Sequence, residues 1–258
     1  MRSSLKIFAL ILFASLFLSF LSQQQHKDPI YYNKQGKPSS KGIDTYINKN
    51  HDNLIAEYEY RIDTLYDVYL FTENLDETGD GDLGNFYLPD YIIINNKERY
   101  VEYEYKNLTK YQQKVMPHTA RTVKGVLFHE LTHAYFNQIL IVSKQEGLPT
   151  SPEYGNIRLF PNPSSRFGAE FIEEGVCEYV VYYLNESSPI REIRIPTTID
   201  ELTEKENRVN IVYGYSVVFL KNFLDEKGLK EGIKILVTNK PPSYDEILNP
   251  QLFFDRLK

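Results

Sequence analysis

The most informative stretch of the chain is Val126–Tyr135, which reads VLFHELTHAY and contains the pattern H-E-x-x-H. An α-helix turns once every 3.6 residues, so His129 and His133 project from one face, one turn apart, and both imidazoles can reach one zinc ion at ~2.0–2.1 Å. Glu130 lies beside them, where its carboxylate can accept a proton from water that the metal activates. The pattern therefore predicts a helix that carries two zinc ligands and a general base.

The residues around this pattern support a helix. Thr119 is a plausible N-cap after Pro117, and from there to about Lys144 the only glycine or proline is Gly125. Apolar residues flank the two histidines, which predicts that this helix lies in the interior beside a cleft. A random H-E-x-x-H in a chain with five histidines is expected in about one such sequence in a hundred. Chance is therefore a poor explanation.

A catalytic zinc ion needs a third protein ligand and one open position. No histidine follows His133, so the third ligand is expected to be a carboxylate. The outstanding candidate segment is 171–179, FIEEGVCEY, which offers Glu173 and Glu174. The alternative interpretation of this segment is a solvated acidic face of a helix.

This segment resembles the second motif of the gluzincin zinc peptidases, which include the thermolysin and alanyl aminopeptidase families. Their motif reads N-E-x-x-S/A-D or W-L-N-E-G-F-A-E-Y, and its first glutamate is the third zinc ligand. The resemblance covers nine residues and implies that Glu174 binds the metal and that Glu178 is an acceptor that orients a ligand histidine. Glu173 replaces the usual asparagine and stays open as an alternative ligand. The spacing between His133 and Glu174 is about twice the usual one, and we place the extra length in a loop, 146–168.

The resemblance also implies a tyrosine whose hydroxyl group donates a hydrogen bond to the oxyanion formed on the substrate carbonyl. In the aminopeptidase family it lies on a later helix, and Tyr213 is the candidate here, with Tyr215 as the alternate. The G-x-M-E-N loop of the exopeptidases is absent. The segment Gly84–Ile94 resembles the edge strand that pairs with an extended substrate in small gluzincins. An endopeptidase is therefore favoured over an aminopeptidase, although the sequence leaves the choice open.

Cys177 is the only cysteine, so the chain cannot form an internal disulfide. No histidine lies near it in the sequence, and we expect a small buried apolar side chain rather than a nucleophile.

An acidic loop, Asp76–Asp82, contains oxygen-bearing side chains that could bind calcium. Its spacing does not match an EF-hand, and a solvated turn is the favoured interpretation.

The N-terminal segment indicates export. Basic residues precede an apolar run, 7–21, and a polar stretch follows it, which is typical of a signal peptide. The run is short for a membrane span, so residues 1–22 are interpreted as a signal peptide or an N-terminal anchor. Residues 23–41 are polar and predict a linker. The expected location is periplasmic, extracellular or membrane-tethered.

Composition narrows the class of partner. The net charge of −6 leaves no basic face for nucleic acid, and it allows membrane contact only through an N-terminal anchor. The 42% hydrophobic and 25% charged residues are those of an ordinary globular domain. A protein or peptide substrate is the expected partner, whereas the oligomeric state stays open.

The order of predicted elements favours an α+β domain over residues 42–258. A helix is expected at about 43–63, strands at 66–71, 91–95 and 100–105, and later helices at about 169–184, 208–227, 229–238 and 244–257. We expect a zincin-like fold, with a small, mostly antiparallel sheet and the active-site helix over a C-terminal helical lobe.

The predicted function is zinc-dependent peptide-bond hydrolysis. Two other functions fit the same residues. One is a noncatalytic binding or scaffold domain of gluzincin fold, in which the metal is structural or absent. The other is a zinc hydrolase that acts on a non-peptide amide bond.

Overall fold

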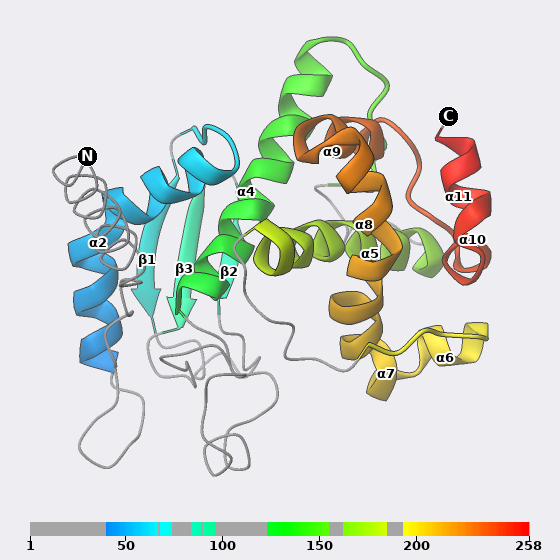
Figure 1. The fold of residues 1–258 in the computed structure, drawn as a ribbon, viewed down its shortest axis with the longest axis horizontal. Coiled ribbons are helices and arrows are strands. Elements are labelled where there is room, and N and C mark those ends of the chain that lie inside the picture. Colours follow the sequence, from blue (N-terminus) through cyan, green and yellow to red (C-terminus); the bar gives the residue numbers. More distant parts are fainter. Residues whose placement is uncertain are drawn as a thin grey trace, which may run out of the picture. The chain divides into compact units, whose positions relative to one another are not determined.

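The computed structural model of the protein describes residues 40–66, 68–73, 84–88, 90–95, 123–154, 162–184 and 193–257. Helices carry most of these residues and the strands form one small sheet, so the class is α+β, as predicted (Figure 1). In chain order the elements are α2 (Ser40–Arg61), β1 (Tyr69–Glu73), β2 (Gly84–Tyr87), β3 (Tyr91–Asn95), α4 (Val123–Gln145), α5 (Pro163–Tyr179), η4 (Val180–Leu184), α6 (Ile199–Thr203), α7 (Lys205–Asn210), η5 (Ile211–Tyr215), α8 (Ser216–Lys227), α9 (Leu229–Val237), α10 (Tyr244–Leu248) and α11 (Pro250–Arg256).

Several predicted features lie outside the described residues. They are the N-terminal leader, nearly all of the linker, the strand at 100–105, the acidic loop Asp76–Asp82 and the N-cap Thr119. Helix α2 begins at Ser40, which falls at the end of the predicted linker. Within the described part of the chain, no helix combines the length and the apolar character that a membrane span needs.

The sheet is mixed, with strand order β1-β3-β2. β2 pairs with β3 in antiparallel fashion, but β1 runs parallel to β3. The expectation of a mostly antiparallel sheet was therefore wrong for one of the two pairings. A parallel pair needs a crossover of a dozen or more residues. The stretch of sequence between Glu73 and Tyr91, which contains β2, is long enough for one.

One face of the sheet belongs to the hydrophobic core. Leu70, Ile92 and Ile94 are buried, whereas Tyr69 and Phe71 on the opposite face are about half exposed. This alternation follows from the two-residue repeat of a strand. Helix α4 packs against β2 and β3, and α2 packs against β1 and α4. The edge strand β2 is therefore held directly against the helix that carries the H-E-x-x-H pattern.

The helices of the C-terminal half pack around α5. It contacts α4 on one side and η5 and α8 on another, while α9 packs against α4 and α8. Phe219 of α8 sits in an aromatic cluster and contacts Phe171, Tyr215 and two phenylalanines of α11, Phe253 and Phe254. A buried side chain of this size contributes roughly 1.5–3 kcal/mol through removal of apolar surface from water.

Helix ends differ from the predicted ones for local reasons. α5 begins at Pro163, earlier than expected, because Oδ1 of Asn162 accepts a hydrogen bond from the N–H of Ser164 at 2.9 Å and caps the helix. The predicted helix at 208–227 contains a π-helical segment, η5, between α7 and α8. The helix predicted at 244–257 is interrupted at Asn249, just before Pro250.

Candidate metal centre

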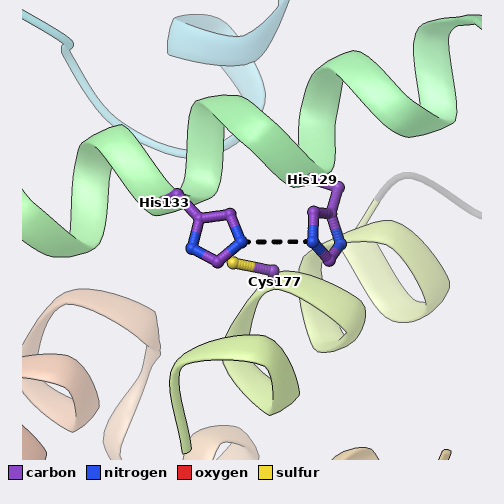
Figure 2. Close-up of side chains that lie close together, drawn as sticks. All are labelled: His129, His133 and Cys177. Carbon is purple, nitrogen blue, oxygen red and sulfur yellow. Dashed lines mark hydrogen bonds between the residues drawn. The ribbon is translucent and has the colours of Figure 1, made fainter. Parts of the chain in front are cut away.

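Helix α4 positions the two histidines of the H-E-x-x-H pattern. Both rings project from α4 toward α5, and their centroids are 4.9 Å apart (Figure 2). The Nε2 atoms of His129 and His133 face each other at 3.2 Å. His129 is only 7% exposed, so water has little access to these nitrogens.

Helix α5 adds a carboxylate to the same point. Oε2 of Glu174 lies 3.0 Å from Nε2 of His129 and 3.7 Å from Nε2 of His133. Adjacent ligand atoms of a tetrahedral zinc ion with bonds of ~2.0–2.1 Å are about 3.3–3.4 Å apart. The three donor atoms therefore form a triangle of the size that one zinc ion requires. Oε2 of Glu174 is also buried without an aligned hydrogen bond, which is costly unless a cation satisfies it.

The opposite nitrogens of both rings face carboxylates from α5. Nδ1 of His133 makes a 2.9 Å hydrogen bond with Oε1 of Glu173, and Nδ1 of His129 lies 2.9 Å from Oε1 of Glu178. A carboxylate can only accept, so the hydrogen bond with Glu173 places the proton of neutral His133 on Nδ1, and the close approach of Glu178 favours the same tautomer for His129. Both Nε2 lone pairs are then directed at the space beside Glu174. Glu173, the alternative ligand in the sequence, instead lies behind His133.

The charges of the site favour a cation. Burial lowers the pKa of His129, but contacts with Glu174 and Glu178 raise it by more, so its pKa is above the usual value. Burial raises the pKa of Glu174, but the neighbouring His133 and His129 lower it by more, so its pKa is well below the usual value. Glu174 is therefore ionised at neutral pH. Two facing nitrogens at 3.2 Å beside an ionised carboxylate need a shared proton or a metal ion between them.

Glu130 lies beside the three donor atoms and is 6% exposed. The backbone N–H of Phe86 in β2 lies within reach of its carboxylate and lowers the pKa of Glu130 by less than burial raises it. Burial is the main cause that raises the pKa of Glu130 above its usual value, because a charged carboxylate is disfavoured away from water.

Cys177 is the residue that sequence reasoning missed. It is buried, as expected, but its Sγ lies in one cluster with His129 and His133, in which the ligand atoms are within 4.8 Å of one another (Figure 2). Burial raises the pKa of the thiol to about 12, so it is neutral at physiological pH in the absence of a metal. Its position three residues after Glu174 places it on the same helix face, and this spacing was the available signal.

The two candidate tyrosines occupy different environments. Tyr213 lies in η5 with its ring centroid 6.1 Å from that of His129, at an interplanar angle of 30°. Tyr215 is buried and its hydroxyl donates to the backbone carbonyl of Ile247 at 3.2 Å. The alternate, Tyr215, is therefore part of the core, and Tyr213 is the tyrosine that lies at the site.

Gly175, the residue after Glu174, allows α8 to approach α5 closely. A Cβ atom at Gly175 would lie 2.8 Å from Cβ of Ser216 and 2.9 Å from Cδ1 of Leu220. Non-bonded carbon atoms in proteins do not approach so closely. The glycine thus sets the distance between α5 and α8.

Comparisons of the chain with models of protein families, with curated proteins and with solved structures found no match, so the resemblance to gluzincins rests on the chain's own residues.

Proposed function

We propose that the chain is a zinc-dependent peptidase of the gluzincin type, with a zincin-like fold over residues 42–258. The observation that carries the proposal is the donor triangle of His129, His133 and Glu174, with distances of 3.0, 3.2 and 3.7 Å. An acidic acceptor behind each histidine adds support, because ligand histidines in zinc sites almost always donate their second N–H.

The chain's own residues then have the following roles. Zinc would activate water and polarise the substrate carbonyl. Glu130 accepts the proton of the attacking water on its carboxylate and passes it to the leaving amine. Tyr213 donates its hydroxyl proton in a hydrogen bond to the oxygen of the attacked carbonyl. Glu173 and Glu178 hold the two rings in the tautomer that frees both Nε2 atoms.

The proposed substrate is an extended protein or peptide, and the proposed reaction is internal cleavage. An edge strand beside the site, β2, supports an extended main chain as partner. The net charge of −6 argues against nucleic acid. The N-terminal apolar run supports an exported location.

One observation favours a second candidate function, a structural zinc site. If Cys177 joined His129, His133 and Glu174 as a ligand, the ion would have four protein ligands and no open position. Such a closed site would stabilise a noncatalytic domain. A Cys177 thiol that stays protonated, as its burial favours, leaves the position open.

The test uses purified protein loaded with zinc and a panel of unfolded protein substrates. Glu130→Gln should keep full zinc content and lose about 10²–10⁴-fold in kcat. Glu206→Gln, at an exposed position of α7, is the matched control and should keep full activity. Retained hydrolysis in Glu130→Gln would refute the proposed role.

Cobalt substitution separates the two candidate functions. A thiolate ligand gives cobalt(II) an intense charge-transfer band in the near ultraviolet, whereas nitrogen and oxygen ligands do not. The peptidase proposal expects no such band and an unchanged spectrum in Cys177→Ser. A strong band that disappears in Cys177→Ser would favour the closed structural site.

A further inference from the structure

Strand β2 approaches α4 most closely at Gly84. A Cβ atom at this position would lie 2.9 Å from Cγ1 of Val126, 3.0 Å from Cγ of Glu130 and 3.2 Å from Oε1 of Glu130. These distances are shorter than ordinary van der Waals contacts between such atoms. The space that the Glu130 side chain occupies is therefore the space that a side chain at position 84 would need.

The same strand also holds the Glu130 carboxylate. The backbone N–H of Phe86 is a main-chain donor that lies within reach of it. Phe86 lies opposite Ile92 of β3 in the antiparallel pair, and N–H groups alternate in direction along a strand. An N–H that reaches Glu130 is thus one that does not serve the β2–β3 ladder. Gly84 supplies the room, and Phe86 supplies the donor.

We propose that Gly84 is a positioning residue for the general base: its missing side chain lets Glu130 lie against β2, where the Phe86 N–H fixes the carboxylate. This inference rests on the proposed function in that it takes Glu130 as the base. The packing of Glu130 against Gly84 does not depend on that function. Gly84 reaches the site through Glu130, because the other close atom belongs to the apolar side chain of Val126 and none of the zinc-ligand candidates is among the atoms closest to it.

The effect of Gly84→Ala follows from which atoms can move. The backbone of β2 is tied to β3 by its register, and Val126 is fixed in the buried face of α4. The end of the Glu130 side chain is the group that yields most easily, by rotation about its χ angles. Gly84→Ala therefore turns the carboxylate away from β2 and breaks its hydrogen bond with Phe86.

The first experiment needs no metal and no activity. The amide signal of Phe86 is followed by NMR in metal-free protein labelled with ¹⁵N-phenylalanine. Glu130→Ala, which removes the acceptor, should shift this signal strongly in the wild-type background. In the Gly84→Ala background the same substitution should hardly shift it, because the hydrogen bond is already lost. Comparing the two backgrounds cancels the direct effect of the new methyl group.

Two NMR outcomes would overturn the inference. One is an equal shift on Glu130→Ala in both backgrounds, which would mean that Glu130 keeps its place despite the added methyl group. The other is no shift in the wild-type background, which would mean that Phe86 does not donate to Glu130.

The second experiment measures zinc content and steady-state kinetics of the zinc-loaded protein. Gly84→Ala should keep one zinc per chain and lower kcat about 10- to 100-fold with little change in KM, because the base is misplaced while the metal and the substrate contacts stay. Gly147→Ala adds the same methyl group at an exposed turn with no heavy atom within 4 Å of the new Cβ, but the φ of 76° at Gly147 makes the change strain the backbone. It therefore controls for a general loss of stability, and it should leave kcat unchanged. Unchanged kcat in Gly84→Ala would overturn the inference. If the Phe86 amide signal shifts on Glu130→Ala as expected but the zinc-loaded wild type hydrolyses no peptide, the proposed function is refuted and the positioning of Glu130 by Gly84 is not.

Discussion

The Nε2 atoms of His129 and His133 lie 3.2 Å apart, while the Nδ1 atom of each ring faces a different glutamate of α5. This arrangement determines what the pair can do. Two lone pairs that face each other repel unless a cation lies between them, and the outer carboxylates strengthen both lone pairs. The proposed zinc site depends on this pairing and on Glu174.

Glu173→Gln tests whether the charge behind His133 matters. The amide can still accept the proton of Nδ1, but it removes one negative charge from a buried site. We expect zinc affinity to fall about 10- to 100-fold, measured by competition with a chromophoric chelator. Glu206→Gln removes an exposed carboxylate and serves as the control. Equal affinities of Glu173→Gln and the wild type would contradict this role.

Gly175→Ala tests the close packing of α5 on α8. The new methyl group would overlap Ser216 and Leu220, so we expect the free energy of unfolding to fall by about 1–3 kcal/mol. Urea denaturation measures it. Adding Ser216→Gly removes the nearest clashing atom, and the double variant should lose less stability than the two single changes together. Full additivity would show that the two residues do not share this contact.

Asp63 predicts a pH dependence of stability. Its hydrogen-bonded ion pair with Lys230 at 2.8 Å is the main cause that lowers its pKa, and Tyr135 of α4 also donates to it at 2.8 Å. A lowered pKa stabilises the folded state above the unfolded pKa of about 3.9, and this stability is lost as the pH falls through the folded value.

Asp63→Asn should therefore lower the free energy of unfolding by about 1 kcal/mol at pH 7, a modest value because the pair is partly exposed to water. The difference from the wild type should shrink as the pH is lowered from 5 toward 3. Urea denaturation across this range measures it. A difference that stays constant with pH would mean that the charge of Asp63 is not involved.

Local sequence patterns predicted the longer helices and many residues of the candidate metal centre. The spacing of His129 and His133 requires only one turn of helix, and the predicted helix corresponds to α4. Glu178 lies beside His129, which is where the gluzincin resemblance implies an acceptor. The segment Gly84–Ile94, inferred to be an edge strand, contains the edge strand β2 and most of the central strand β3. The helix and the strands depend on residues close together in the sequence, whereas the place of Glu178 beside His129 came from the resemblance.

The features that sequence reasoning missed depend on long-range contacts. Cys177 and His133 come together only because α4 and α5 pack side by side, and no periodicity reveals that packing. The role of Glu173 was ambiguous because a carboxylate can bind either a metal or a histidine. The parallel pairing of β1 with β3 depends on the path of the chain between them, which residue types in the strands do not encode.

The zinc content of the purified protein shows whether His129 and Glu174 hold a metal. It is measured by elemental analysis for the wild type, His129→Ala, Glu174→Ala and Cys177→Ser. We expect one zinc per chain in the wild type and in Cys177→Ser, and loss of zinc in His129→Ala and Glu174→Ala. Absence of zinc from the wild type even after zinc is added, or loss of zinc in Cys177→Ser with retention in Glu174→Ala, would contradict the proposed zinc site.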